Sequence, residues 1–193
     1  MTLIFNHGTM GAGKSAVLIA KATSIQANAL FLKPAKDTRD GENYISSRNG
    51  MKLRVHATVA PESDIEEIFL SFFSGKVNSP HMKYIFVDEA QFLTKKNIEE
   101  LMYIGFEYGV RVECFGLLVN FKSELFEGSK RLIELCDEMI ELPSFDAYGY
   151  KAVQNARLVD GEIVRDGPET HLGKEESYQA MSNKMFFRNF KGE

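Results

Sequence analysis

The sequence predicts an α/β fold in which helices flank a mostly parallel sheet, with a small lobe at the C-terminal end. Over the first 142 residues, short apolar segments typical of buried strands alternate with segments of helical periodicity. Such alternation favours parallel strands joined by crossover helices. After Pro143 the pattern changes to short strands separated by turn residues. We therefore expect an α/β domain over residues 1–142 and a small lobe over residues 143–193.

The first elements of the larger domain surround a glycine-rich turn. A strand is expected at 2–6, and a helix is expected at 15–27, where apolar residues lie in a good helix-forming context. Residues 29–32 again have the composition of a buried strand. The stretch 33–50 is polar and contains one proline and two glycines, so it is expected to be an excursion from the sheet.

The rest of the larger domain continues the alternation. Thr94 is the expected N-cap of a helix that ends near Tyr108, because a threonine hydroxyl accepts a hydrogen bond from the free amides at a helix start. The other expected elements, in order, are a strand at 52–59, a helix at 62–73, strands at 84–87 and 110–118, a helix at 123–137 and a strand at 139–142.

The small lobe is expected to contain a hairpin and a long loop. Asp160 and Gly161 form a two-residue turn signal between strand-like segments at 152–159 and 162–165. Residues 168–177 are polar and show no periodicity, which indicates a loop without regular structure.

Composition excludes several classes of protein. No apolar run approaches the roughly 20 residues that cross a bilayer, and no basic leader precedes the first strand, so we expect a cytoplasmic protein with no membrane partner. Two cysteines in apolar or helical patterns indicate a reducing compartment. The net charge of −4 argues against a nucleic-acid partner, because a polyanion requires a basic face.

The turn between the first strand and the first helix matches the P-loop pattern G-x-x-x-x-G-K-S. Its glycines allow backbone amides to point at phosphate oxygens. Lys14 is placed to bind the β- and γ-phosphates, and the Ser15 hydroxyl is placed to bind Mg²⁺. The sequence therefore predicts a P-loop NTPase-like sheet that binds ATP and Mg²⁺ through Gly8, Thr9, Met10, Gly11, Ala12, Gly13, Lys14 and Ser15.

Two carboxylates follow the apolar strand expected at 84–87. In parallel sheets, ligands bind at the carboxyl ends of the strands, where Asp88 and Glu89 stand. Neighbouring residues at a strand end point in different directions. Asp88 is therefore the expected second Mg²⁺ ligand, and Glu89 is the candidate base that accepts a proton from an attacking hydroxyl.

Four further stretches extend these motifs: 32–40 (LKPAKDTRD), Ser47-Arg48, 87–93 (VDEAQFL) and 126–129 (FEGS). Together with the two motifs they resemble the thymidine kinase family of cytosolic, bacterial and phage enzymes, over nearly the whole chain. The resemblance implies transfer of the γ-phosphate of ATP to the 5′-hydroxyl of thymidine, with acceptance of deoxyuridine left open. It implies that Glu89 is the base, in agreement with the argument above, and that the chain forms a homotetramer or homodimer.

The resemblance also implies roles for individual residues. Arg48 joins Lys14 and Glu89 as a catalytic side chain, because guanidinium groups bind anionic oxygens through two parallel hydrogen bonds. The loop before Tyr178 resembles the lasso that encloses the base in this family. The residues implied to bind substrate are Met10, Asp37, Arg39, Phe92, Leu117, Phe121, Phe126, Thr170, His171, Leu172, Gly173 and Tyr178.

The chain departs from the family in its small lobe. Most members hold the lasso with a structural zinc bound by two Cys-x-x-Cys pairs, and this chain contains neither pair. The positions aligned with those ligands are Phe145, Tyr148, Ser182 and Met185, none of which is a good zinc ligand. We therefore expect a lobe without zinc, in which the three apolar residues form a plug worth roughly 1.5–3 kcal/mol per large side chain.

Two other functions remain open to these residues. A nucleic-acid motor has a similar Asp-Glu-Ala-Gln run after a strand, although the size and acidic charge of this chain oppose it. An ATP-binding nucleotide sensor or interaction module without catalysis is compatible with the altered lobe. Lys14, Ser15, Asp88 and Glu89 oppose the sensor because all four are present.

Overall fold

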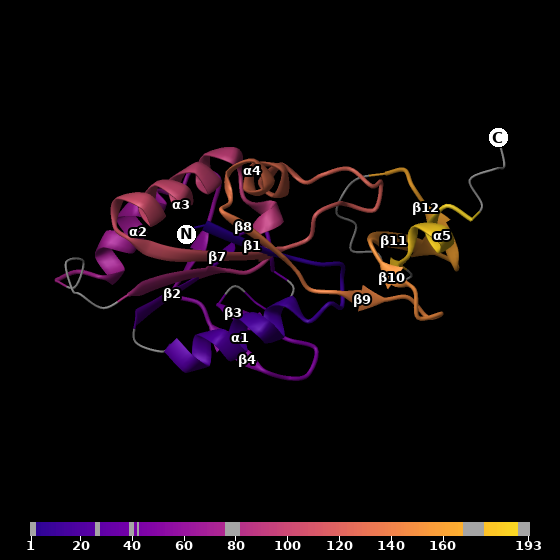
Figure 1. Ribbon diagram of the computed structural model, residues 1–193, viewed down its shortest axis with the longest axis horizontal. Coiled ribbons are helices and arrows are strands. Elements are labelled where there is room, and N and C mark those ends of the chain that lie inside the picture. The colour runs from indigo at the N-terminus through magenta and orange to yellow at the C-terminus, as the bar shows by residue number, and fades with distance from the viewer. Residues whose placement is uncertain are drawn as a thin grey trace.

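The computed structural model describes residues 3–25, 28–38, 41, 43–75, 82–167 and 176–188. Within these ranges six parallel strands form the central sheet (Figure 1), in agreement with the predicted fold class. The strand order across the sheet is β5 (Ala57–Val59), β2 (Ala29–Pro34), β6 (Lys83–Val87), β7 (Val110–Gly116), β1 (Leu3–His7) and β8 (Glu138–Glu141). All strands point the same way, so their carboxyl ends meet along one edge.

Helices cover both faces of this sheet, which explains why its central strands are almost wholly apolar. Helix α1 (Lys14–Ile25) packs on one face, where Leu18 contacts a cluster that includes Phe86 and Phe115. The other face is covered by α2 (Ile65–Phe72), α3 (Lys95–Glu107) and α4 (Glu127–Leu135), as Figure 1 shows. None of the helices in the described part of the chain is long and apolar enough to span a membrane.

The helix starts follow their capping residues. Thr94 accepts a hydrogen bond from the Asn97 amide while the Asn97 side chain accepts one from the Thr94 amide, so the predicted cap is confirmed as a capping box. The helix expected from residue 123 begins later, at Glu127. The preceding segment is a turn, in which Asn120 Oδ1 accepts hydrogen bonds from the amides of Lys122 and Glu124.

The single strand expected at 52–59 is wrong: it is two strands in two different sheets. Strand β4 (Lys52–Arg54) pairs with β3 (Tyr44–Ser46) in a hairpin, whereas β5 pairs with β2. The chain changes partner at His56, which donates its amide hydrogen to the Phe31 carbonyl and accepts one from the Phe31 amide at Nδ1. Alternating polarity does not reveal that a strand changes its pairing partner. The excursion expected at 33–50 is also partly wrong, because it contains strand β3.

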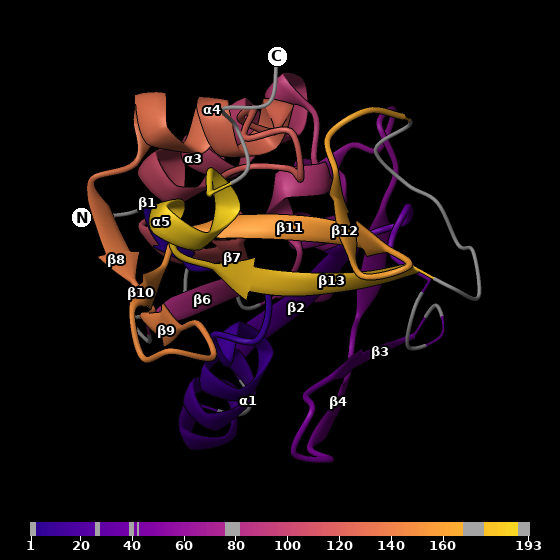
Figure 2. The ribbon, with the colours of Figure 1, turned by 90° about the vertical axis from the view of Figure 1, so that its right-hand side faces the viewer.

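Strands β9 to β13 and helix α5 form a separate antiparallel region, which we call the small lobe (Figure 2). Asp160 and Gly161 adopt φ angles of 50° and 83°, so the predicted tight hairpin is confirmed. Residues 168–175 of the expected loop lie outside the described residues, and residues 176–177 already belong to β13. The elements are β9 (Ser144–Phe145), β10 (Lys151–Ala152), β11 (Gln154–Val159), β12 (Glu162–Val164), β13 (Glu176–Met181) and α5 (Asn183–Phe186).

The expected apolar plug is wrong for two of its three residues. Phe145 and Tyr148 are 63% and 67% exposed, and only Met185 packs against buried residues of the lobe. A polar contact occupies this corner instead, because Asp146 accepts hydrogen bonds from the amides of Tyr148 and Tyr150. The Ser182 hydroxyl and these amides lower the pKa of Asp146 by stabilising its carboxylate.

Candidate active site

The P-loop connects the end of β1 to the start of α1. Gly11 and Gly13 have φ angles of 81° and 79°, a conformation that other residues rarely adopt. Lys14 is buried, and its ammonium group donates hydrogen bonds to the carbonyls of Gly8 at 3.1 Å and Thr9 at 2.8 Å. The loop therefore holds a buried positive charge beside the backbone amides of a helix start, which is a favourable arrangement for an anion.

Ser15 and Asp88 are in direct contact although they belong to different motifs. The Ser15 hydroxyl donates a hydrogen bond of 2.8 Å to Asp88 Oδ2. Asp88 is 4% exposed, and its other oxygen has no hydrogen-bond partner within the described residues. Burial and the neighbouring Glu89 carboxylate raise the pKa of Asp88 to about 7. A hydroxyl beside an unsatisfied buried carboxylate fits a hard cation such as Mg²⁺, which would favour the ionised form.

The backbone turns sharply after Asp88. Glu89 has a φ of 51°, in the left-handed region, and the 3₁₀ helix η2 (Ala90–Phe92) follows it. The two carboxylates have different partners: Asp88 contacts Ser15, and Glu89 contacts Gln91. Both residues line a cavity beside the P-loop, but Asp88 is buried whereas Glu89 is partly exposed. A non-glycine residue in this conformation is strained, a feature that occurs often at active sites.

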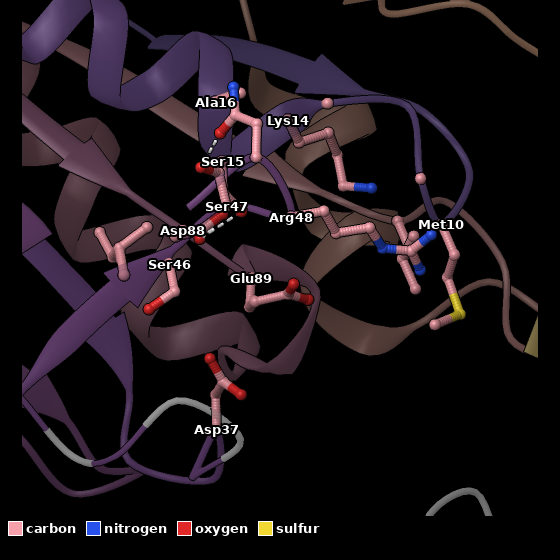
Figure 3. A pocket seen from close by; sticks show the side chains of 15 residues that line it. Met10, Lys14, Ser15, Ala16, Asp37, Ser46, Ser47, Arg48, Asp88 and Glu89 are labelled. Carbon is pink, nitrogen blue, oxygen red and sulfur yellow. Dashed lines mark hydrogen bonds between the residues drawn. The ribbon is translucent and has the colours of Figure 1, made fainter. Parts of the chain in front are cut away.

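The cavity has a volume of about 430 Å³. The P-loop, the ends of β2 and β6 and the turn between β3 and β4 surround it. Figure 3 shows the charged ends of Lys14, Arg48 and Glu89 facing one region of the cavity. The residues predicted from the sequence that line it are Met10, Gly11, Gly13, Lys14, Ser15, Asp37, Arg48, Asp88, Glu89 and Leu117. Gly8, Thr9 and Ala12 belong to the P-loop but do not line the cavity.

The β3–β4 hairpin brings residues to the cavity that the sequence did not indicate. Ile45 and Ser46 of β3 and Asn49 of the following turn line it together with Arg48. A β-carbon on Gly11 would lie 3.3 Å from Arg48 Nη1, which shows how closely the guanidinium approaches the loop. The only sequence signals near these residues were the polar composition of 33–50 and the stretch Ser47-Arg48.

Asp37 lines the cavity and forms an ion pair with a buried lysine. Lys33 is 1% exposed, and its Nζ atom lies 3.4 Å from Asp37 Oδ2. The same ammonium donates hydrogen bonds to the carbonyls of Gly41 at 2.9 Å and Tyr44 at 3.2 Å. Lys33 therefore connects β2 to the segment before β3. Sequence reasoning did not single it out, because it stands in a strand that is otherwise apolar.

The aromatic residues implied to surround the base are not among the residues that line this cavity. Phe92 and Phe126 contact each other edge to face, with ring centroids 5.6 Å apart. Phe121 is buried against the guanidinium of Arg157, whose central carbon lies 5.2 Å from the ring centroid. Tyr178 stands opposite Arg157 in the pairing of β11 with β13. Arg39, Thr170, His171, Leu172 and Gly173 lie outside the described residues.

Asn155 connects the P-loop to the small lobe, and sequence reasoning missed it. Its Oδ1 atom accepts a hydrogen bond of 2.8 Å from the Met10 amide, and its Nδ2 atom donates one of 3.1 Å to the Val119 carbonyl. The side chain is 3% exposed. The hydroxyls of Thr9 and Ser144 form a second connection between the same regions. An asparagine in a strand carries no sequence signal for such long-range contacts.

A parallel sheet, a glycine-rich loop before α1 and a serine–aspartate pair at the strand ends together define a P-loop nucleotide-binding protein. Comparison with known proteins narrows this class. A family model described as thymidine kinase matches residues 1–186, and the chain therefore belongs to the thymidine kinase family.

Curated relatives agree with this membership. A thymidine kinase from Enterobacteria phage T4 is 38% identical over 90% of each chain. One from Encephalitozoon cuniculi is 38% identical over 89% of this chain and 79% of its own. One from Streptococcus gordonii is 34% identical over 96% of each. Among solved structures, the genome packaging NTPase B204 from Sulfolobus turreted icosahedral virus 2 superposes on 77% of this chain with a TM-score of 0.42 and 11% identity.

Proposed function

We propose that this chain is a thymidine kinase that transfers the γ-phosphate of ATP to the 5′-hydroxyl of thymidine. The observation that carries the proposal is the convergence of Lys14, the Ser15–Asp88 pair and Glu89 on one cavity. These groups correspond to the three needs of phosphoryl transfer: binding of the phosphates, neutralisation of their charge, and orientation of the nucleophile. Relatives named thymidine kinases over nearly the full chain support the choice of acceptor.

In the proposed mechanism the P-loop amides and Lys14 bind the triphosphate. Arg48 contributes a guanidinium from the β3–β4 turn, on the same side of the cavity. The residues that would hold Mg²⁺ are Ser15 and Asp88, whose oxygens already face each other. When bound, this ion supplies positive charge to the oxygens of the transferred phosphate.

Glu89 orients the acceptor and takes its proton. The 5′-oxygen forms a bond to the γ-phosphorus while the bond from that phosphorus to the β–γ bridging oxygen breaks, so that ADP leaves. The hydroxyl proton passes to the Glu89 carboxylate. Met10 and Leu117 on the cavity wall, and Tyr178 with Thr170, His171, Leu172 and Gly173, are the proposed contacts of the nucleoside.

The same proposal covers the organisation of the chain. We place the boundary between the nucleotide-binding domain and the small lobe after residue 142, and we propose a small lobe without zinc in a cytoplasmic homo-oligomer. No group of three or more His, Cys, Asp or Glu side chains that could hold a metal occurs within the described residues, which leaves the prediction about zinc to direct measurement. Light scattering distinguishes a dimer from a tetramer.

One assay tests the function. ATP consumption is measured with thymidine, with deoxyuridine, with other nucleosides, with single-stranded DNA and with no addition. We expect turnover only with thymidine and close analogues, with thymidine monophosphate as the product. Stimulation by DNA would identify a motor instead. Binding of ATP without turnover under every condition would identify a nucleotide sensor.

A further inference from the structure

The carboxamide of Gln91 bridges the proposed base to the backbone of a neighbouring strand end. Its Nε2 atom donates a hydrogen bond of 2.5 Å to Glu89 Oε2. Its Oε1 atom accepts a hydrogen bond of 3.0 Å from the Leu117 amide, just after β7. Gln91 is 2% exposed and does not line the cavity, so any influence on substrate must pass through the residues that it contacts.

The contacts of Gln91 determine which end of the amide faces Glu89. A backbone N–H only donates, so the atom that faces Leu117 must be the carboxamide oxygen. The amino group therefore faces Glu89, whose Oε2 atom accepts the hydrogen bond. The two contacts are consistent with each other, and reversing the amide would break both at once.

Tight packing leaves this side chain little room to move. A β-carbon on Gly116 would lie 2.7 Å from Gln91 Oε1 and 3.1 Å from the Gln91 amide nitrogen, so β7 and η2 pack closely. The Gly116 carbonyl in turn accepts a hydrogen bond from the Gly8 amide at 3.4 Å. The bridge therefore connects the Glu89 carboxylate to strand ends that also support the P-loop.

From this geometry we propose that Gln91 is a positioning residue for phosphoryl transfer, which holds the Glu89 carboxylate toward the acceptor hydroxyl. The proposal rests on the proposed function. Glutamate has several rotatable bonds, and a carboxylate on a partly exposed turn samples other directions when nothing restrains it. Restraint of a catalytic group in its productive direction accelerates the chemical step without changing how tightly substrates bind.

The test compares rates in two backgrounds. Gln91→Met keeps the length of the side chain but removes both its donor to Glu89 and its acceptor for the Leu117 amide. Single-turnover measurements report the chemical step even where product release limits kcat. We expect Gln91→Met to lower the single-turnover rate about 10- to 100-fold, with KM for ATP and thymidine changed less than about twofold. In a Glu89→Gln background the same change should lower the rate less than about twofold, because the group that it positions is already lost.

Further variants separate positioning from stability. Gln91→Glu keeps the acceptor for the Leu117 amide and removes the donor, so it should lower the rate at least as much as Gln91→Met. Gln154→Met is the matched control: Gln154 also bridges two partners, Ser123 and Asn183, but lies in the small lobe. The control should keep the wild-type rate. Melting temperatures and binding of an ATP analogue show that each variant is folded.

Each outcome supports or overturns the inference. Equal rate losses in both backgrounds, a raised KM with an unchanged rate, or a Gln91→Glu variant as fast as wild type would show that Gln91 serves only packing. If Gln91→Met does not fold, the comparison of Gln91→Glu with and without Glu89→Gln gives the same answer. A wild-type protein without thymidine-dependent turnover overturns the proposed function and this inference together, whereas an active wild type with unaffected Gln91 variants overturns only the inference.

Discussion

The two sides of the candidate site differ in how their residues are held. On the phosphate side, Lys14, Ser15 and Asp88 stand at strand ends or a helix start, and hydrogen bonds between 2.8 and 3.1 Å connect them to one another or to the P-loop. On the proposed nucleoside side, Phe92 and Phe121 do not line the cavity and lie in two separate contacts, with Phe126 and with Arg157. The sheet itself builds the first side, whereas the proposed second side belongs to loops and to the small lobe.

This difference indicates that the phosphate side is the more rigid of the two. Parallel strands end at one edge and bring their side chains together through the backbone pairing that holds the sheet. The small lobe meets that edge through a few side-chain contacts, of which Asn155 makes two. Substitutions on the phosphate side should therefore affect chemistry directly, and substitutions in the lobe should affect binding and stability.

The largest effect is expected for Glu89→Gln. Loss of the base should lower kcat about 10²- to 10⁴-fold, because general base catalysis contributes about that much. Affinity for an ATP analogue should stay the same, since the phosphate contacts belong to the P-loop. Steady-state kinetics and calorimetry measure the two quantities. An unchanged kcat would show that Glu89 is not the base.

A smaller effect is expected for Asn155→Ala, which tests the connection between the two sides. The change leaves the Met10 amide and the Val119 carbonyl without a partner, and a buried polar group without a hydrogen bond costs about 1–3 kcal/mol of unfolding free energy. We expect a lower melting temperature and a higher KM for both substrates. Asn183→Ala is the control, because it removes an exposed hydrogen bond in the same lobe. Equal effects of the two variants would contradict the connection.

A pH-dependent effect is expected at the corner of the small lobe. The pKa of Asp146 is lowered in the folded state, so its ionised form contributes stability that is present above the ordinary pKa of about 3.9 and is lost as the pH falls through the lower, folded value. The melting temperature of wild type should exceed that of Asp146→Asn at pH 7, and this difference should shrink below about pH 4. A difference that does not change between these pH values would argue against the polar corner.

The smallest effect is expected from chelation. If the small lobe contains no structural zinc, EDTA should leave the melting temperature of the nucleotide-free protein unchanged. Removal of a structural zinc would instead cost on the order of 10 kcal/mol and lower the melting temperature. Elemental analysis of the purified protein provides an independent measurement. Stoichiometric zinc would show that residues outside the aligned positions bind the metal.

Sequence reasoning succeeded where function and local structure use the same residues. The glycine-rich pattern identified a loop whose Gly11 and Gly13 have positive φ and which lines the cavity. Thr94 and Asp160-Gly161 likewise determine a helix start and a turn on their own. It failed at 52–59, where one alternating segment is divided between two sheets. It also failed at Phe145 and Tyr148, because an aligned position does not determine exposure.

By itself the sequence determined the class of fold, the P-loop and the pair of carboxylates after β6, since each of these depends on residues close together in the chain. The tertiary structure alone decided which residues meet across long separations: Gln91 with Leu117, and Asn155 with Met10 and Val119. The physical reason is that a buried polar side chain takes whichever partner the packed elements bring to it. That partner depends on the arrangement of the sheet and the lobe, which no local pattern encodes.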